Sequence, residues 1–219
     1  MIIDHCEYPD DLLYDVENGI WVEPRGEVVR VGVTSLLSFS FGVFSAVTFR
    51  GIGTPLARGQ VMGTLEGAKH FDVFRSPLAG ALSGVNGPLM EDPGVLNRDP
   101  YGEGWFAEIR PRSMDEVGAL GRLQEVKPRI SQLLRERRVH CYAAFPDFEI
   151  FDAGVECQAV LAKLNEFMDR STLGTVVLVV SDDASADVEM DRWSDQTGNP
   201  IVDRRKEGNL YHFVVRKEV

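Results

Sequence analysis

Lys69 is expected at the exposed tip of a hairpin. Lys69 follows Gly67 and Ala68, between residues 61–66 and residues 71–75, two segments in which apolar and polar side chains alternate. Alternation with a period of two predicts half-buried strands, and the glycine between them predicts a hairpin loop. A lysine at such a tip is solvated and can be reached from most directions. Taken alone, Lys69 predicts no more than an exposed turn residue.

Two groups of residues accompany this lysine at fixed spacing. Glu66 stands three residues before it, and the turn Ser76-Pro77-x-x-Gly80 follows the second strand. A second group lies in residues 85–105. It comprises Val85, Asn86, Asp92, Pro93, Asn97, Asp99, Pro100, Tyr101, Gly102, Gly104 and Trp105. Both groups resemble signatures of the glycine cleavage H-protein family, and the resemblance covers roughly residues 10–125.

The resemblance implies a cofactor, a fold and a role for two residues. Lys69 would carry lipoate in amide linkage, and Glu66 would be recognised by the lipoate ligase. The fold would be a β barrel-sandwich hybrid with flanking helices. A biotinyl hairpin would be expected to carry methionine on both sides of its lysine, and Ala68 and His70 argue against that. The lead-in to Trp21 also resembles H-like lipoate-binding proteins found with sulfur-oxidation enzymes.

Two positions depart from the pattern of the glycine cleavage members. Gly19-Ile20-Trp21 stands where the family has His-Glu-Trp, and Val43 follows Gly42 where the family tends to have an acidic residue. In the family these positions lie where the loaded arm would be received. The departures argue against membership in a glycine-decarboxylating system, and they leave the attachment of lipoate unaffected.

Cys157 is the second residue with candidate chemistry. It precedes a helical stripe of apolar residues made up of Val160, Leu161, Leu164, Phe167 and Met168. A thiol at a helix N-terminus is stabilised as thiolate by the helix dipole and the unpaired N–H groups, and a persulfide carrier needs such a sulfur. The acidic neighbour Glu156 opposes this effect. The alternative is a structural cysteine.

The surroundings of Cys157 predict a small domain. Residues 148–219 read as β-α-β-α-β-β, which favours a two-layer α/β sandwich. Gly154, Cys157, Asp182, Asp183 and the closing Arg216-Lys217 resemble the TusA-like sulfur-carrier family, in which the cysteine carries a persulfide. That family usually has Cys-Pro-x-Pro, whereas this chain continues Gln158-Ala159-Val160. A degenerate carrier domain used for docking is therefore the alternative.

Charge marks a boundary between the two predicted domains. Residues 111–146 hold 7 basic and 4 acidic side chains, whereas residues 1–110 and 147–219 each hold 15 acidic and 8 basic side chains. We therefore expect an H-protein-like lipoyl domain over residues 1–125, a basic helical linker over 126–147 and a TusA-like domain over 148–219.

Helical signals precede and occupy the predicted linker. Ser113 and Glu116 have the spacing of a capping box. Pro128 is expected to interrupt the helix, and a second helix over residues 129–138 would then carry a basic rim. That rim is either a solvated face or a docking surface for acidic groups. Apolar residues within residues 12–16 suggest a further short helix near the N-terminus.

Composition excludes some partners and compartments. A net charge of −11 and a pI near 4.8 argue against nucleic acid or an anionic membrane as the main partner. Cys6, Cys141 and Cys157 are odd in number and lack a Cys-x-x-Cys pair, so neither a disulfide framework nor a zinc site is expected. Cys6 and Cys141 are expected to be buried and inert, with a redox role near the arm as the alternative for Cys6. The N-terminus lacks a secretory pattern, so the expectation is a cytoplasmic protein with reduced thiols.

These observations favour a carrier over an enzyme in its own right. The arm on Lys69 would swing between partners, and sulfur transfer through Cys157 is the favoured cargo chemistry. Expected partners are a lipoate ligase, a dihydrolipoyl dehydrogenase, and a sulfurtransferase or heterodisulfide-reductase-like complex. One alternative is a glycine cleavage H protein that shuttles an aminomethyl group between the glycine cleavage enzymes. Another is a non-lipoylated scaffold or regulatory protein.

Overall fold

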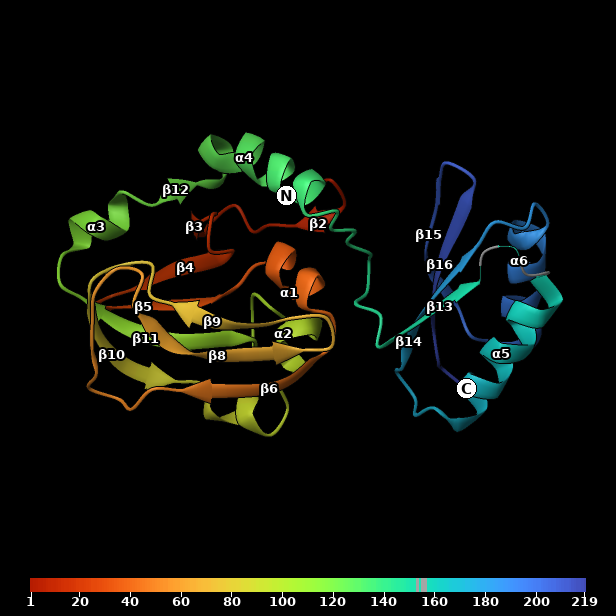
Figure 1. Cartoon of the computed structure of the whole chain (residues 1–219), viewed down its shortest axis with the longest axis horizontal. Helices are drawn as coiled ribbons and strands as arrows, with labels where there is room; N and C mark the ends of the chain where they lie inside the picture. Colours follow the sequence, from red (N-terminus) through yellow and green to blue (C-terminus); the bar gives the residue numbers. More distant parts are fainter. Residues whose placement is uncertain (153, 155–156) are drawn as a thin grey trace. The chain divides into compact units, whose positions relative to one another are not determined.

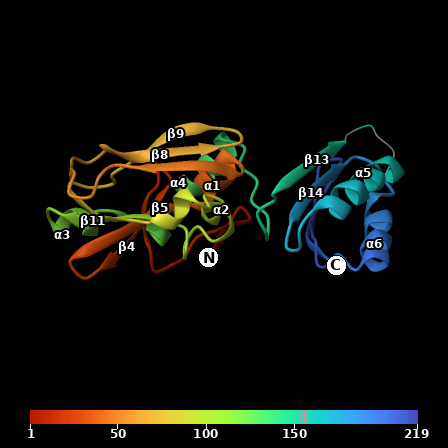
Figure 2. The same ribbon diagram turned by 90° about the horizontal axis from the view of Figure 1, so that it is seen from below.

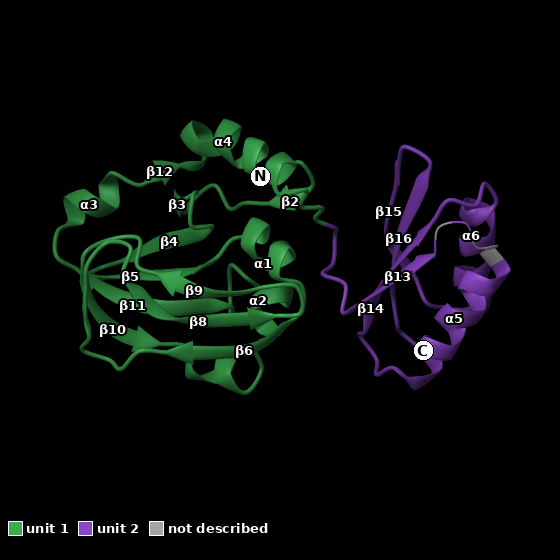
Figure 3. Ribbon diagram, in the orientation of Figure 1, with its two compact units in different colours: residues 1–141 green, residues 142–219 purple. Residues whose placement is uncertain are grey.

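The chain folds into two compact units. A computed structural model describes residues 1–152, 154 and 157–219, and Figure 3 colours the two units. The first unit spans Met1–Cys141 and the second spans Tyr142–Val219. Residues 126–147, expected to form a linker, are thus divided between the units.

The first unit is rich in short strands (Figure 1). Its strands are β1 (Ile2–Ile3), β2 (Cys6–Glu7), β3 (Leu13–Asp15), β4 (Ile20–Arg25), β5 (Val28–Val33), β6 (Phe44–Phe49), β7 (Pro55–Leu56), β8 (Val61–Gly67), β9 (Phe71–Arg75), β10 (Gly80–Val85), β11 (Trp105–Pro111) and β12 (Gly121–Arg122). Its helices are α1 (Ser35–Phe41), the 3-10 helix η1 (Gly87–Met90), α2 (Val95–Arg98), α3 (Met114–Gly118) and α4 (Leu123–Glu136). The β-rich character predicted for this half of the chain is confirmed.

Two sheets enclose the main core of this unit. The larger sheet has the order β12-β3-β4-β5-β11-β10-β7, and the smaller has the order β6-β8-β9. Figure 2 shows β8 and β9 lying in a layer over β5 and β11. The ring of Phe74 in β9 stacks on that of Phe106 in β11, with 4.0 Å between centroids, and Phe49 of β6 packs on Phe106 at 4.7 Å. These rings tie the hairpin β8–β9 to the larger sheet, because stacked aromatic pairs add attraction beyond the apolar area they bury.

Helix α4 packs on a second core in the same unit. Its buried residues Leu123, Ile130 and Leu133 share a cluster with Trp21 of β4. The helix continues through Pro128, so the predicted interruption is wrong. Proline removes one backbone hydrogen bond from a helix interior, and burial of the apolar side chains on the same helix outweighs that loss.

The basic rim of α4 contacts acidic groups of its own unit. Arg129 makes a paired contact with the Glu17 carboxylate, with Nε–Oε1 and Nη2–Oε2 distances of 2.6 and 2.9 Å. Arg135 lies 3.6 Å from Asp4. The hydrogen bonds from Arg129 hold the pKa of Glu17 below its usual value. Part of the rim therefore holds α4 against the N-terminal segment.

Two further local predictions are wrong. Residues 12–16 contain the strand β3 rather than a helix, because β3 pairs with both β4 and β12. Ser113 caps α3 by accepting from the Asp115 N–H, but the Glu116 carboxylate accepts from the backbone N–H of Ala79 instead of reaching back to the cap. In both cases a partner distant in the sequence decides the local structure.

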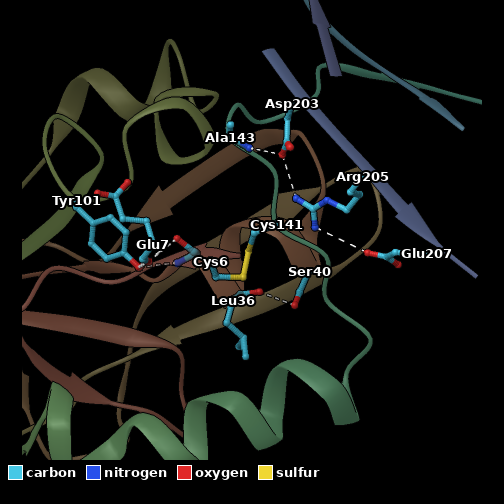
Figure 4. The surroundings of a disulfide bond; sticks show 11 residues. Cys6, Glu7, Leu36, Ser40, Tyr101, Cys141, Ala143, Asp203, Arg205 and Glu207 are labelled. Carbon is cyan, nitrogen blue, oxygen red and sulfur yellow. Dashed lines mark hydrogen bonds and ion pairs between the residues drawn. A yellow bond between two sulfur atoms is a disulfide. The ribbon is translucent and has the colours of Figure 1, made fainter. Parts of the chain in front are cut away.

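Cys6 and Cys141 form a disulfide (Figure 4), which overturns the expectation of separate reduced thiols. Both residues are buried, at 0% and 1% exposure, so the expected burial is confirmed. The bond joins β2 to the last residue of the first unit across 135 positions of sequence. The cysteine content therefore no longer supports a reducing compartment.

The second unit has the predicted element order. It consists of β13 (Phe148–Asp152), α5 (Cys157–Arg170), β14 (Val176–Ser181), α6 (Ala186–Thr197), β15 (Ile201–Glu207) and β16 (Leu210–Arg216). The sheet order is β13-β14-β16-β15, with β13 parallel to β14 and the other two pairs antiparallel.

Both faces of this mixed sheet carry buried apolar residues. On one face α5 and α6 bury Leu164, Met190 and Trp193, among others, and the Trp193 indole N–H donates to Asn165 of α5. On the other face Tyr142 packs against a smaller cluster, and its hydroxyl lies 2.8 Å from His212 Nδ1. Burial raises the pKa of Tyr142. Residues just before β13 thus form part of the second unit.

We predict that the disulfide stabilises the first unit strongly. Replacing Cys141 by Ser should lower the free energy of unfolding by about 3–5 kcal/mol, because the bond closes a loop of more than 100 residues in the unfolded chain. Urea unfolding followed by circular dichroism measures the change. Wild-type protein in excess dithiothreitol and the Cys6→Ser variant should both unfold like Cys141→Ser. Unfolding midpoints that are equal with and without reductant would contradict the prediction.

Candidate functional site

Lys69 lies at the tip of the hairpin formed by β8 and β9, as predicted. The strands pair in antiparallel register with Glu66 opposite Phe71. The side chains of Glu66, Lys69 and His70 are exposed. The structure therefore brings the two residues named from the sequence, Glu66 and Lys69, to the same accessible end of the hairpin.

The tip is docked by its backbone onto the end of α1 and the residues that follow it. The N–H of Lys69 donates to the carbonyl of Phe41, and the N–H of Ala68 donates to the carbonyl of Val43, each at 2.9 Å. The Gly67 N–H closes the turn by donating to His70 at 2.8 Å. The lysine backbone is thus held by hydrogen bonds that lie outside its own hairpin.

A buried asparagine holds the segment on which the tip docks. Asn97 of α2 is 5% exposed. Its Oδ1 accepts from the Phe44 N–H at 2.8 Å, and its Nδ2 donates to the Gly42 carbonyl at 3.0 Å. The same Nδ2 lies 3.2 Å from Ser38 Oγ. Because one side chain binds both sides of Val43, the segment has little freedom to shift.

The Lys69 side chain is not solvated on every side. Its Cγ and Cδ lie against the backbone of Gly42, the residue between the two carbonyls that bind the tip. The exposed end of the side chain thus extends from a stem that rests on the protein surface, which corrects the expectation of access from most directions.

Other residues of the two signatures build the surrounding fold. The Asn86 side chain donates to the carbonyls of Glu103 and Trp105, and the Asp99 carboxylate accepts from two backbone N–H groups in the following turn. Tyr101 donates to the Glu7 carbonyl at 2.7 Å, and burial raises the pKa of its hydroxyl. These residues therefore position loops of the first unit through hydrogen bonds to the backbone.

Cys157 is the first residue of α5, as predicted. Its side chain lies outside the described part of the structure, as do residues 153, 155 and 156, so the predicted effect of Glu156 is not addressed. Nearby, the Gly154 N–H donates to the Asp182 carboxylate at 2.7 Å, and Asp183 accepts from both the N–H and the hydroxyl of Ser185. The residues named with Cys157 therefore make structural contacts in the loops beside it.

The described residues hold neither a cluster of metal ligands nor a helix that could span a membrane. They contain no group of three or more His, Cys, Asp or Glu side chains that could hold a metal ion. Within the same residues, every helix is too short or too polar to cross a membrane. What the described site offers chemically is the primary amine of an exposed lysine on a hairpin tip that is docked through its backbone.

Comparison with known proteins assigns the first unit. The model of the glycine cleavage H-protein family matches residues 12–132, which is more than half of the chain. This chain belongs to the glycine cleavage H-protein family. Proteins of this family are lipoylated. The family match ends within α4, and residues 142–219 are assigned to no family.

Three individual proteins are similar to the first part of this chain. A probable glycine cleavage system H protein 2 of Sulfolobus acidocaldarius is 30% identical over 140 residues, which cover 63% of this chain and 94% of the relative. A glycine cleavage system H protein of Anaeromyxobacter sp. is 32% identical over 114 residues, covering 52% and 88%. The crystal structure of such a protein from Mycobacterium marinum matches with a TM-score of 0.49 and 25% identity, covering 60% of this chain and 100% of that one.

Sequence reasoning missed the residues that hold the tip in place. Gly42 and Phe41 carry no side-chain chemistry, and Asn97 entered only as one member of a signature. Asn97 lies 53 positions from Phe44, whose N–H it binds, and no local sequence pattern indicates a contact over that separation. A glycine directly after a short apolar segment was the one available signal, since glycine often ends a helix.

We predict that Asn97→Ala destabilises the first unit by about 2–4 kcal/mol, because it leaves the Phe44 N–H and the Gly42 carbonyl buried without a partner. Urea unfolding measures this change. Gln132→Ala is the matched control, since the Gln132 amide donates to Glu136 on the exposed face of α4, and its loss should cost less than about 1 kcal/mol. Equal losses in the two variants would show that Asn97 does not hold the loop.

Proposed function

We propose that this protein is a lipoyl carrier whose arm is attached to Lys69. The observation that carries the proposal is an exposed lysine side chain at a hairpin tip that is docked on residues 41–43, in a chain of the H-protein family. An attachment point needs an accessible amine and a fixed backbone, and this arrangement supplies both. The protein would contribute positioning and effective concentration, while the arm supplies the reactive disulfide.

The attachment chemistry follows from the exposed amine. The neutral amine of Lys69 would attack the carbonyl carbon of a lipoyl group that the ligase has activated as a mixed anhydride with phosphate. An amide bond forms, the carbonyl–oxygen bond to the phosphate leaving group breaks, and the amine loses a proton to a base or water. Glu66, exposed near the same tip, is placed to meet a cationic group of the ligase. A dihydrolipoyl dehydrogenase would interconvert the dithiol and disulfide forms of the arm, with a nicotinamide cofactor as the electron partner.

As the more specific part of the proposal, the cargo is sulfur. Cys157 would hold sulfane sulfur as a persulfide, and it would leave as thiolate when a dithiol takes the outer sulfur. The lipoyl group on Lys69 would supply that dithiol, and it would be oxidised to the cyclic disulfide as the sulfur is released as hydrosulfide. The dehydrogenase would then reduce the disulfide again with electrons from a nicotinamide cofactor. The persulfide itself would come from a partner sulfurtransferase or a heterodisulfide-reductase-like complex. The position of Cys157 as first residue of the 14-residue helix α5 supports this role.

The glycine cleavage alternative is supported by the family but not by two residues of this chain. Ile20 is 1% exposed in the main core, and Val43 is apolar with its carbonyl engaged by Ala68. Neither position offers a charge to complement the cation of an aminomethyl-loaded arm. A carrier for another cargo therefore agrees better with these residues.

We predict that incubation with lipoate ligase, lipoate and ATP adds the mass of one lipoyl amide to the protein. The Lys69→Arg variant should stay unmodified, because arginine keeps the charge but offers no acylable amine. Lys127→Arg is the matched control, since Lys127 is also exposed, and it should be lipoylated like the wild type. Intact-mass spectrometry gives the result. An unmodified wild type would favour the scaffold alternative.

We predict that Cys157 is required for sulfur loading. Lipoylated protein incubated with a sulfurtransferase and thiosulfate should gain one alkylatable persulfide, and the Cys157→Ser variant should gain none. Mass spectrometry after alkylation measures the persulfide content of both proteins. Loading of the wild type and Cys157→Ser to the same extent would remove the sulfur role of this residue, and loading with an aminomethyl group by glycine decarboxylase would favour the glycine cleavage alternative.

A further inference from the structure

Gly42 lies directly under the stem of the candidate lipoyl lysine. Its φ is +71° and its ψ is −160°, a combination that is essentially restricted to glycine, and it is the C-cap of α1. A Cβ added to Gly42 would lie 3.2 Å from Lys69 Cγ, 3.4 Å from Lys69 Cδ and 3.5 Å from the Cβ of Ala68. A side chain at position 42 would therefore meet the methylene groups of the lysine, and the lysine stem would have to shift by a few tenths of an ångström.

The backbone of the lysine is fixed on both sides of this contact. Lys69 donates to Phe41, the residue before Gly42, and Ala68 donates to Val43, the residue after it. The side chain then lies over Gly42 itself. The lysine is therefore held twice by the same three-residue segment, once through backbone hydrogen bonds and once through its stem.

The glycine cannot move away from the lysine at low cost. Its carbonyl accepts the 3.0 Å hydrogen bond from Asn97, which is buried. Moving the glycine would break that bond or leave a buried polar group unsatisfied. A side chain introduced at position 42 would therefore displace the lysine stem rather than the backbone beneath it.

From this geometry we infer that Gly42 is a positioning residue for lipoylation. It seats the Lys69 stem so that the amine leaves the tip in one direction. The inference rests on the proposed attachment of lipoate to Lys69. A free lysine side chain has many rotamers, and an acylating enzyme must select the few that bring the amine to the activated carbonyl. Because the stem already rests on Gly42, part of this rotamer freedom is lost before the ligase binds.

The contact between the Lys69 stem and Gly42, here called the seat, affects acylation after the ligase has docked on the hairpin. Loss of the seat should therefore lower kcat and leave KM for the carrier little changed. A purely structural defect acts differently, because a smaller folded fraction raises the apparent KM and leaves kcat at saturation unchanged. The two effects can be separated in one kinetic experiment.

The test compares Gly42→Ala with Gly26→Ala as substrates of lipoate ligase. Gly26 is the control for a positive φ, because its φ is +64° and nothing lies within 4 Å of an added Cβ, so alanine there is strained but meets no neighbour. We expect Gly42→Ala to lower kcat roughly three- to tenfold, the range expected from one ordered side chain. Gly26→Ala should have the kcat of the wild type, and thermal unfolding gives the folded fraction of each variant, against which the apparent KM is compared.

A second measurement covers the case in which Gly42→Ala fails to fold. Any side chain is strained at the φ and ψ of Gly42, so this measurement uses the wild type. Carbon-13 relaxation should show more restricted motion for Lys69 Cγ than for the Cγ of Lys127, an exposed lysine on α4, and equal mobility of the two would refute the seat. If the wild type is lipoylated and a folded Gly42 variant has the kcat of its Gly26 counterpart, the seat is refuted while the proposed function stands. If the wild type is not lipoylated at all, the proposed function itself fails.

Discussion

The geometry of the carrier tip depends on the hydrogen bonds of the buried Asn97 amide. This amide binds the Gly42 carbonyl and the Phe44 N–H, and the carbonyls of Phe41 and Val43 in turn bind the hairpin tip. A hairpin tip with no such support would fray, because loop residues have few buried contacts to offset the entropy of ordering. Here a helix residue far along the chain fixes the loop, and the loop fixes the lysine.

The same design separates the rigid part of the molecule from the part that would move. The rings of Phe49, Phe74 and Phe106 join the two sheets behind the hairpin, so the strands that carry the tip cannot tilt without opening the core. Only the outer end of the Lys69 side chain extends beyond its contact with Gly42. A tethered group on that side chain would therefore sweep from a defined origin, which is how a carrier converts two binding events into an intramolecular delivery.

Local pattern predicted much of this architecture, and long-range contacts account for what it missed. The hairpin around Lys69 and the helical stripe of α5 follow from periodicity, since their own residues determine both elements. The prediction that Pro128 interrupts the helix failed because the apolar residues that follow it are buried in a core that the local sequence does not reveal. The Cys6–Cys141 bond joins residues 135 positions apart, and cysteine spacing carries no information about such a pair. The contact between the Lys69 stem and Gly42 could not be predicted either, because it depends on glycine having no side chain.

Attachment of lipoate to Lys69 in the working protein is tested most directly by tandem mass spectrometry of peptides from protein isolated from its own cells. The peptide containing Glu66 and Lys69 is expected to carry one lipoyl group, with the fragment ions placing it on the lysine. A peptide recovered only in its unmodified form, from cells whose other lipoyl proteins are fully modified, would contradict a lipoyl arm on Lys69.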